Sequence, residues 1–557
     1  MGSLAFDYDI HGWLTSIESG SFCEKLHYHD GLGTPLYNGN ISSITWKGRN
    51  APHDRGYRFT YDDLSRVVSS EYGENNFTKL VGKYDERTYY DRNGNITHLV
   101  RNGMRQDGSI GSIDDLQLKY DGNLLESVEE RAPAILNVNS LDVKRSSQDI
   151  RYNNNGSLKC DGTRGITNIV YDNSNNPVRI QFDNGNVTKY VYSATGQKLR
   201  SIHYTAAPNI HVSMDSIYNG IEENFLTVDS MDYMAGGSIV YANNAPSMIL
   251  FDGGYIGASY AEGLCYGRPV RHPGMTDEEY QGLLEKWMKL MNTQTLSLDL
   301  RFYTKDHLGN NREVIDTEGN VCQSVDYYPF GTPYSDGESA MLATGQQYKY
   351  NGKELDPMHG LNTYDYGARQ YNPILPRWDR IDPLAEKYYN VSPYTYCEDN
   401  PIRYIDPNGK EKHDGVGEKN NNNKKLHIMA KEIQDDPNAI VIVAHGVADN
   451  NGSINSFNFK TYNKKKNVWE NHYISNGKDF DKLLTSISPL WRNYKAGKSP
   501  SPKIVLFACG TNKVAERISQ TESFNGIDII APNDNVLAWP QNGYLPIVGH
   551  QVKISTD

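Results

Sequence analysis

The sequence lacks the features that mark a membrane protein, a disulfide-rich secreted domain or a nucleic-acid-binding protein. Its six cysteines are scattered without a CxxC pair, so their spacing predicts neither a zinc site nor a disulfide framework. No apolar run approaches the roughly 18 residues that a membrane helix needs. The net charge of −12 argues against nucleic acid as a partner of the whole chain. We expect no metal ion and no other cofactor.

The first residues, "MGSLAFDYDIHGW", carry neither the basic start nor the apolar stretch of a Sec signal peptide. Together with the scattered cysteines, this predicts folding in a reducing compartment. Export of the protein would then depend on a machine other than the Sec pathway.

Tyrosine and glycine, by contrast, are abundant at 40 and 49 residues, and they favour short strands joined by tight turns. One degenerate unit recurs. It has an aromatic residue, Asp or Asn, a few polar residues with Gly, and then aliphatic residues that alternate with polar ones. Asp or Asn with Gly between alternating runs is a hairpin signal. Two short strands are therefore predicted in each unit, at 6–17, 59–70, 89–100, 118–128, 151–160, 170–180, 191–202 and, more loosely, 303–315.

As a set, these units resemble the YD-repeat (RHS-repeat) family, and the segment 345–410 makes the resemblance more specific. It contains, in order, "YNGKE", "YDYGARQY", "SPYTY" and "NPIRYIDPNGK", which look like the RHS-associated core domain. The resemblance implies a mostly β fold, with a YD-repeat β-shell over 1–344, partial or closed, and the core domain after it. In this family the repeats wind into a hollow shell, and the chain beyond the core is a variable toxin or effector that the shell encloses.

Partners and a place of action are also implied by the resemblance. A polymorphic toxin of this type is made in the bacterial cytoplasm and is carried by a component of a secretion system. It acts in a target cell, where a protein would be its substrate. A cognate immunity protein is the other implied partner.

One helix is expected in the body, between Gly274 and Leu300. Thr276 can cap it, and acidic residues fill its first turn. Its apolar residues recur at helical spacing and predict a packed face, made of Leu283, Leu284, Trp287, Leu290 and Met291.

The core segment holds candidate residues for self-cleavage. In RHS proteins that release their C-terminal domain, paired aspartates cut the chain just after a DPxG segment, and Asp382 and Asp406 match those aspartates. Arg377 matches the arginine that precedes the first Asp-Pro, and Lys410 stands beside the expected cut, where cleaving members carry Leu. Two carboxyls suit this chemistry because one activates water while the other, protonated, polarises the carbonyl. The alternative is that Asp-Pro only forms turns.

The sequence changes character beyond the core. Residues 411–425 are charged and rich in asparagine, which predicts a polar linker. In 426–557, "NAIVIVAHG", "PKIVLFACG" and "GIDIIAPN" are apolar runs bounded by turn residues, as buried parallel strands are. A hairpin region at 453–474 and helices at 477–488 and 512–520 alternate with them, which predicts an α/β sandwich.

His445 and Cys509 each stand at the end of one predicted parallel strand, where residues face the ligand crevice of such a sheet. A cysteine nucleophile needs an imidazole to hold it as thiolate. The N–H groups of Gly446 and Cys509 are suited to form an oxyanion hole. This arrangement resembles the caspase-like clan of cysteine peptidases and implies a cysteine endopeptidase that cleaves target-cell proteins.

Other interpretations stay open at this stage. A cysteine after an apolar strand is often only packed, and His-Gly is often only a turn. The tail would then be a non-catalytic binding or adhesion module with a peptidase-like fold. A further alternative is a cysteine hydrolase that acts on a non-peptide acyl group.

Overall fold

The computed structural model describes the chain in two stretches, each with gaps. The first comprises residues 5–105, 107–133, 141, 143, 146–222, 224–251, 253–260, 275–293, 296–335 and 346–416. The second comprises 439–443, 445–448, 454–463, 468–474, 476–487, 489–497, 503–507, 529–532 and 551–554. The chain divides into a large unit of Met1–Tyr233, Val240–Met248 and Gly254–Lys419 and a small unit of Met234–Ile239, Ile249–Gly253 and Asn420–Asp557.

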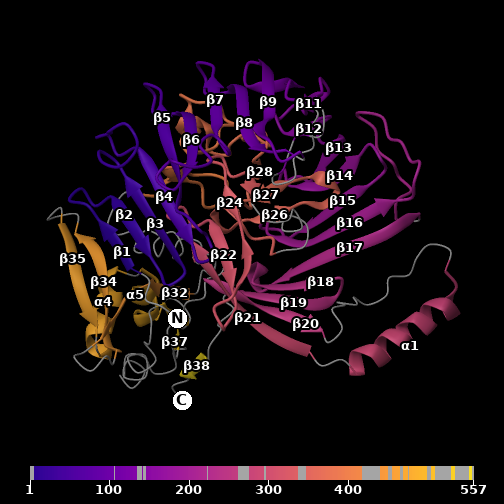
Figure 1. Ribbon diagram of the computed structural model, residues 1–557. Helices are drawn as coiled ribbons and strands as arrows, with labels where there is room; N and C mark the ends of the chain where they lie inside the picture. Colours follow the sequence, from indigo (N-terminus) through magenta and orange to yellow (C-terminus); the bar gives the residue numbers. More distant parts are fainter. Residues whose placement is uncertain are drawn as a thin grey trace. The chain divides into compact units, whose positions relative to one another are not determined.

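The first sheet of the large unit runs in chain order, each strand pairing antiparallel with the next (Figure 1). Its strands are β1 (Ala5–Tyr8), β2 (Leu14–Glu18), β3 (Phe22–His27), β4 (Ser43–Gly48), β5 (Arg55–Tyr61), β6 (Val67–Glu74), β7 (Glu86–Tyr90), β8 (Ile96–Met104), β9 (Ile110–Asp121) and β10 (Leu124–Glu130).

The second sheet continues the same meander, with its strands again in chain order. They are β11 (Ile150–Tyr152), β12 (Leu158–Asp161), β13 (Ile166–Tyr171), β14 (Pro177–Phe182), β15 (Val187–Tyr192), β16 (Lys198–Ala206), β17 (Phe225–Met234), β18 (Ile239–Ala242), β19 (Ala245–Phe251), β20 (Gly254–Tyr260), β21 (Leu296–Lys305), β22 (Asn311–Ile315) and β23 (Val321–Ser324). All eight hairpins predicted from the repeats are therefore confirmed, and the described part of the large unit is mostly antiparallel β.

The predicted helix is α1 (Asp277–Thr293), between β20 and β21. Thr276 caps it as expected, since its Oγ1 accepts the N–H of Glu279 while the Glu279 carboxylate accepts the N–H of Thr276. Leu284 is buried and Leu283 is partly exposed, whereas the other side chains of the predicted apolar face lie outside the described residues. No described helix is long and apolar enough to cross a lipid bilayer.

The repeated aspartate holds many of the hairpin turns. At Asp91, Oδ1 accepts the N–H groups of Asn93 and Asn95, both at 2.8 Å, and Oδ2 accepts the side-chain amide of Asn95. Gly94 takes φ of +84°, which closes the turn at low cost, and the strand register slips by one residue at Tyr90. The same carboxylate bonds recur at Asp9, Asp62, Asp172, Asp306 and Asp316.

Repeated tyrosines tie several hairpins to the one before. The hydroxyl of Tyr90 donates to the carbonyl of Val67 on β6, which belongs to the preceding hairpin. Equivalent bonds join Tyr61 to Ile41, Tyr120 to Ile96 and Tyr171 to Leu158. In the pairs Tyr61-Asp62, Tyr90-Asp91 and Tyr171-Asp172, the tyrosine therefore links neighbouring hairpins and the aspartate carboxylate shapes the turn.

The segment after β23 lies on the inner side of the two large sheets in Figure 1. It contains β24 (Asp326–Tyr327), β25 (Pro333–Tyr334), β26 (Glu354–Asp356), β27 (Thr363–Asp365), β28 (Gln370–Asn372), β29 (Arg377–Trp378), β30 (Tyr404–Ile405) and β31 (His413–Asp414), with 3-10 turns at Tyr350–Gly352, Met358–Gly360, Ala385–Tyr388 and Cys397–Asp399. Buried aromatic rings pack it together, such as Tyr371 on Tyr396 at 4.1 Å between centroids.

We call residues 346–410 the core segment, and it contacts the hairpin turns of both large sheets. Arg377 donates to the carbonyl of Asn123, and Arg380 to that of Asn175. The N–H of Ser392 donates to the carbonyl of Asn93. The side-chain amide of Asn400 donates to the carbonyl of Ser65. One continuous segment thus joins repeats that lie far apart in the sequence.

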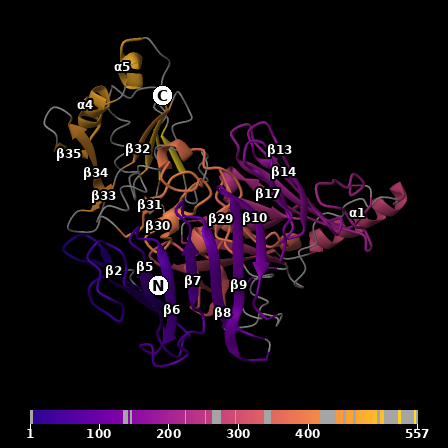
Figure 2. The same cartoon turned by 90° about the horizontal axis from the view of Figure 1, so that it is seen from above.

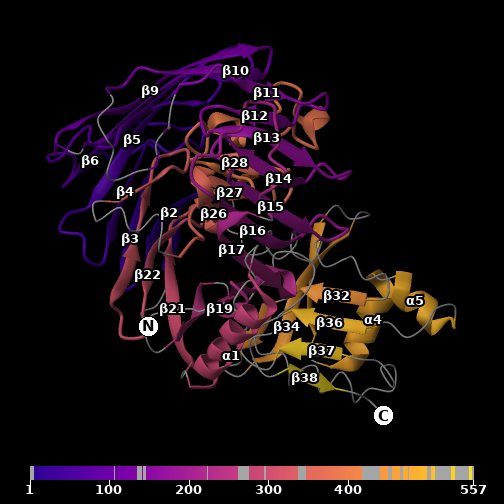
Figure 3. The same ribbon diagram turned by 90° about the vertical axis from the view of Figure 1, so that its right-hand side faces the viewer.

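The described residues of the small unit form two sheets and two helices, and Figure 3 labels several of these elements. β32 (Ala439–Val443) and β37 (Ile529–Pro532) flank β36 (Lys503–Phe507) in parallel, and β38 (Gln551–Ile554) pairs antiparallel with β37. The predicted hairpin region forms the second sheet, and the predicted helix at 477–488 is observed with a short one after it. These elements are β33 (His445–Ala448), β34 (Ile454–Asn463), β35 (Val468–Ile474), α4 (Gly477–Ile487) and α5 (Pro489–Lys495). The predicted helix 512–520 lies outside the described residues, and the caspase-like assignment stays a prediction.

Removing the hydroxyl of Tyr90 should weaken the large unit, because the Val67 carbonyl loses a buried donor. We expect Tyr90→Phe to lower the free energy of unfolding by about 1 kcal/mol. The neighbouring Tyr89 is about half exposed, at 53%, so Tyr89→Phe should change little. Urea titration followed by circular dichroism measures both variants. Equal effects of the two substitutions would contradict the role given to the repeated tyrosine.

Candidate functional site

The predicted aspartate Asp406 shapes the turn in which the expected cut lies. Its Oδ1 accepts the N–H groups of Asn408, Gly409 and Lys410 at 3.1, 2.7 and 3.1 Å. Gly409 has φ of +74°, and a Cβ there would lie 2.9 Å from the amide nitrogen of Arg369. Only glycine fits this close approach without displacing backbone. The "DPNG" sequence therefore fixes the backbone next to Lys410.

The guanidinium of Arg369 connects both predicted aspartates with that turn. Its Nη2 lies 2.9 Å from Oδ2 of Asp382 and 3.4 Å from Oδ2 of Asp406. Its Nε donates to the carbonyl of Gly409 at 2.6 Å. The planar group also stacks over the Trp378 ring at 4.2 Å. One buried cation thus brings Asp382, Asp406 and the Gly409 carbonyl together.

Burial shifts the pKa values of Asp406 and Arg369 in this cluster. Burial raises the pKa of Asp406, although Arg369 and the three backbone N–H groups oppose that shift. Burial also lowers the pKa of Arg369, because two carboxylates only partly offset its desolvation. Two buried carboxylates with a single cation would leave a net negative charge in a low-dielectric site. Asp406 is therefore the carboxyl that burial most favours in its protonated form.

Asp382 sits in a more open position. Its Oδ1 accepts the N–H of Leu384 at 2.7 Å, and its own N–H donates to the carbonyl of Pro393. The exposed fraction of its side chain is 13%, against 5% for Asp406. Water reaches Asp382 more readily, so the two carboxyls differ in environment although they share Arg369.

Arg377, the arginine predicted to join the aspartates, lies elsewhere. Its guanidinium faces the rings of Tyr394, Tyr120 and Tyr152 at 4.8, 5.4 and 5.8 Å. Tyr120 belongs to the last hairpin of the first sheet, and Tyr152 to the first hairpin of the second. Arg377 therefore connects the two large sheets with the core segment, and Arg369 occupies the place between the carboxyls.

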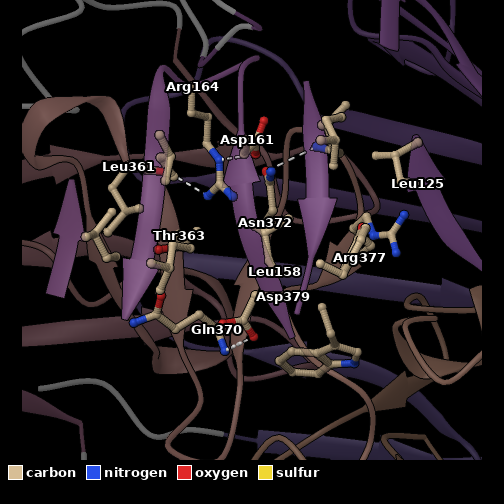
Figure 4. A pocket seen from close by; sticks show the side chains of 17 residues that line it. Leu125, Leu158, Asp161, Arg164, Leu361, Thr363, Gln370, Asn372, Arg377 and Asp379 are labelled. Atoms are coloured by element: carbon tan, nitrogen blue, oxygen red, sulfur yellow. Dashed lines mark hydrogen bonds and ion pairs between the residues drawn. The ribbon is translucent and has the colours of Figure 1, made fainter. Parts of the chain in front are cut away.

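A cavity beside Arg377 is too small for a substrate. It has a volume of about 30 Å³, room for a water molecule or two. Figure 4 shows it between the strands of Leu125 and Leu158 and the core residues Asn372 and Asp379. Within the described ranges, no group of three or more His, Cys, Asp or Glu side chains is arranged to hold a metal ion.

The tail residues are placed only in part. β32 and β36 end side by side, with Val443 opposite Phe507. His445 follows Val443 by two residues and begins β33, where it pairs with Asn458, and Gly446 pairs with Phe457. Cys509 follows Phe507 by two residues and lies outside the described residues. The parallel pairing is the described geometry that bears on the proposed dyad.

Comparison with known proteins gives partial relatives, and no family model matches the chain. The chain is 38% identical over 108 residues to salivary gland surface protein 1 of Aedes aegypti, which is 19% of this chain and 3% of that protein. It is 30% identical over 124 residues to toxin subunit YenC1 of Yersinia entomophaga, 22% of this chain and 12% of that protein. The chain thus matches only a small part of the length of these relatives.

A solved structure of TcdB2-TccC3-Cdc42 aligns with 73% of this chain and 19% of its own chain. The TM-score is 0.43 and the sequence identity is 15%. What the comparisons establish is therefore local: about a fifth of the chain is similar in sequence to a toxin subunit.

Arg369 is the residue of the cluster that sequence reasoning missed. It stands in "YDYGARQY", a motif that contributed to the family resemblance but to which no function was assigned. A buried arginine needs carboxylate partners. The two Asp-Pro pairs contain these partners, so they were the sequence feature from which a buried arginine between them could have been predicted.

Removing the Arg369 cation should destabilise the core segment strongly. We expect Arg369→Met to lower the free energy of unfolding by about 3–5 kcal/mol, because it leaves buried carboxyls without their partner. Arg369→Met combined with Asp406→Asn should lose less than Arg369→Met alone. Arg131→Met is a suitable control, because Arg131 and its partner Glu129 are both exposed. Thermal and urea unfolding measure the series, and a loss as small as the control's would contradict the assigned role.

Proposed function

We propose that the chain is an RHS-type toxin carrier that cuts itself between Gly409 and Lys410 and thereby frees its C-terminal segment. The observation that carries this proposal is the position of Arg369, which contacts both candidate carboxyls and the carbonyl of the bond to be cut. In this account the large unit is the scaffold, and the core segment is an aspartyl self-cleavage centre.

The contacts assign a role to each group. Asp382 takes a proton from a water molecule that attacks the carbonyl carbon of Gly409. Arg369 stabilises the negative charge that develops on the Gly409 oxygen, to which its Nε already donates. The proton that Asp382 accepts then passes to the nitrogen of Lys410, which leaves as an amine, while Oδ1 of Asp406 holds this nitrogen by accepting its N–H at 3.1 Å. The products are a carboxylate at Gly409 and an amine at Lys410.

The toxin role itself rests on the sequence similarity to YenC1, together with the motifs of the core segment. Action in a target cell, a cognate immunity protein and a secretion component as partners, and production in the bacterial cytoplasm belong to the same proposal. Arg377 contributes to it by positioning, since it holds the strand pair β28–β29 against both large sheets.

For the tail we propose a cysteine endopeptidase with a His445–Cys509 dyad and an oxyanion hole at Gly446 and Cys509. The parallel pairing of β32 with β36 supports it, because the two residues follow neighbouring strand ends at the same spacing. Its substrate would be a protein of the target cell.

A binding or adhesion module is the second candidate function. This candidate is favoured by the similarity of part of the chain to a salivary gland surface protein. In this case Cys509 would carry no special reactivity, and a tail without catalysis would act by contact.

The chain of the purified full-length protein should be cut into two fragments, with the C-terminal one beginning at Lys410. We expect Asp406→Asn and Asp382→Asn to slow this cut by at least about 100-fold, because the first weakens the turn that holds the Lys410 nitrogen and the second removes the general base. Asp316→Asn is the matched control, since Asp316 also accepts backbone N–H groups in a turn. Gel electrophoresis and N-terminal sequencing follow the reaction. An intact wild-type chain after prolonged storage would rule out self-cleavage under those conditions.

The thiol of Cys509 should react with iodoacetamide faster than the exposed Cys322 at mildly acidic pH. His445→Ala should remove this difference, because the imidazole is proposed to hold the thiolate. Mass spectrometry of the alkylated full-length chain compares the two cysteines in one sample. Equal labelling of both in the wild type would favour the binding module over the peptidase.

A further inference from the structure

The residues just beyond the proposed cut belong to the large unit. The sequence predicts a polar linker over 411–425, yet the boundary between the two units falls between Lys419 and Asn420. Residues 413–414 form β31, which pairs antiparallel with β30 (Figure 2). In this pairing Tyr404 lies opposite Asp414, and Ile405 lies opposite His413. We call residues 411–416 the clip.

Charged side chains of the clip are paired with the core segment. Oδ2 of Asp414 accepts from Nε and Nη2 of Arg403 at 3.1 and 3.0 Å. Lys412 forms an ion pair with Glu398, and its ammonium lies 4.7 Å from the centre of the Tyr404 ring. All four charged groups are partly buried, so solvent screens these pairs less than it screens pairs on an open surface.

The far end of the clip is buried in the apolar core. Val416 is 1% exposed and belongs to the same cluster as Leu14 and Tyr28. Its carbonyl accepts the N–H of Leu14 at 3.3 Å. The N–H of Gly415 donates to the carbonyl of Arg403 at 2.7 Å. The clip is therefore bound along its length by strand pairing, ion pairs and a buried valine.

These contacts all lie on the C-terminal side of the proposed cut. Cleavage between Gly409 and Lys410 places the clip at the start of the freed segment, while its partners stay in the scaffold. Hydrolysis of that bond removes none of the clip's contacts. The scaffold residues that contact the clip are Leu14, Glu398, Arg403, Tyr404 and Ile405.

We propose that the clip keeps the freed C-terminal segment bound to the scaffold after the cut, so that cleavage and release are separate events. This inference rests on the proposed self-cleavage. The peptide that stays bound to the scaffold is the new N-terminal stretch of the freed segment, with the sequence "EKHDGV" at 411–416. Release then requires β31 to peel away from β30 and Val416 to leave the apolar cluster.

The test compares dissociation of the two fragments in cleaved, full-length protein. Gel filtration after dilution should show the wild-type fragments eluting together. We expect Asp414→Ala and Val416→Asp to release the C-terminal fragment at least about tenfold faster, since each removes contacts made only by the clip. Glu411→Ala is the matched control, because the exposed Glu411 faces only the exposed Lys387 among the contacts described for it.

A second cut separates failure of the clip from failure of self-cleavage. In an Asp406→Asn chain, the recognition sequence of a specific endopeptidase is inserted between Lys410 and Glu411, and the added endopeptidase makes the break. The same variants are then compared. Immediate separation of the fragments without any clip substitution, or equal dissociation rates in Asp414→Ala, Val416→Asp and Glu411→Ala, would overturn the proposal. Slow dissociation that the clip substitutions accelerate would support it even if the wild-type chain never cuts itself.

Discussion

The hydrogen bonds between the core segment and the hairpin turns are the interaction on which the large unit depends. Each strand of the two large sheets pairs only with its neighbours in chain order, as in a repeat array. Glu24 and His307 join distant repeats directly, and the core segment adds further contacts through Arg377, Arg380, Ser392 and Asn400, which reach turns in both sheets. The carboxylates of Asp62, Asp91 and Asp172 shape three of these turns and so present the carbonyls of Ser65, Asn93 and Asn175 that the core segment binds.

The same segment holds the candidate self-cleavage centre, and this placement has a consequence. Arg369 fixes Asp382, Asp406 and the Gly409 carbonyl within a region that is already tied to several repeats. The peptide bond proposed to break, between Gly409 and Lys410, comes later in the chain than every core-segment residue named above as binding a hairpin turn. Hydrolysis of this bond leaves intact the hydrogen bonds that Arg377, Arg380, Ser392 and Asn400 make to the turns. The fold of the scaffold is therefore expected to persist after the cut. On the other side of the bond, the clip keeps its contacts with Arg403 and Leu14.

Features set by neighbouring residues could be predicted from the sequence. The eight hairpins follow from alternation and from turns rich in Asp, Asn and Gly, and α1 follows from its cap and helical spacing. Asp382 and Asp406 were found through a family motif. Arg369 was not found, because its partner Asp406 is 37 residues away in the sequence. The pair points to a site only because both side chains are buried, and burial cannot be seen in the sequence. For the same reason, the charged residues 411–416 had the composition of a linker although Asp414 and Lys412 are paired. Cys509 lies outside the described residues, so its half of the dyad stays a prediction.

Hydrogen exchange at the turn of Asp406 tests the central claim most directly. Full-length protein carrying Asp382→Asn, in which the bond between Gly409 and Lys410 is expected to stay intact, would be exchanged in deuterated buffer, and the peptide that covers residues 404–416 would be followed by mass spectrometry. The account predicts strong protection of the amides of Asn408, Gly409 and Lys410, because they donate to the buried Asp406 carboxyl. It also predicts protection at Gly415, whose amide donates to Arg403. Exchange of these amides as fast as in an unstructured peptide would contradict both the cleavage centre and the clip.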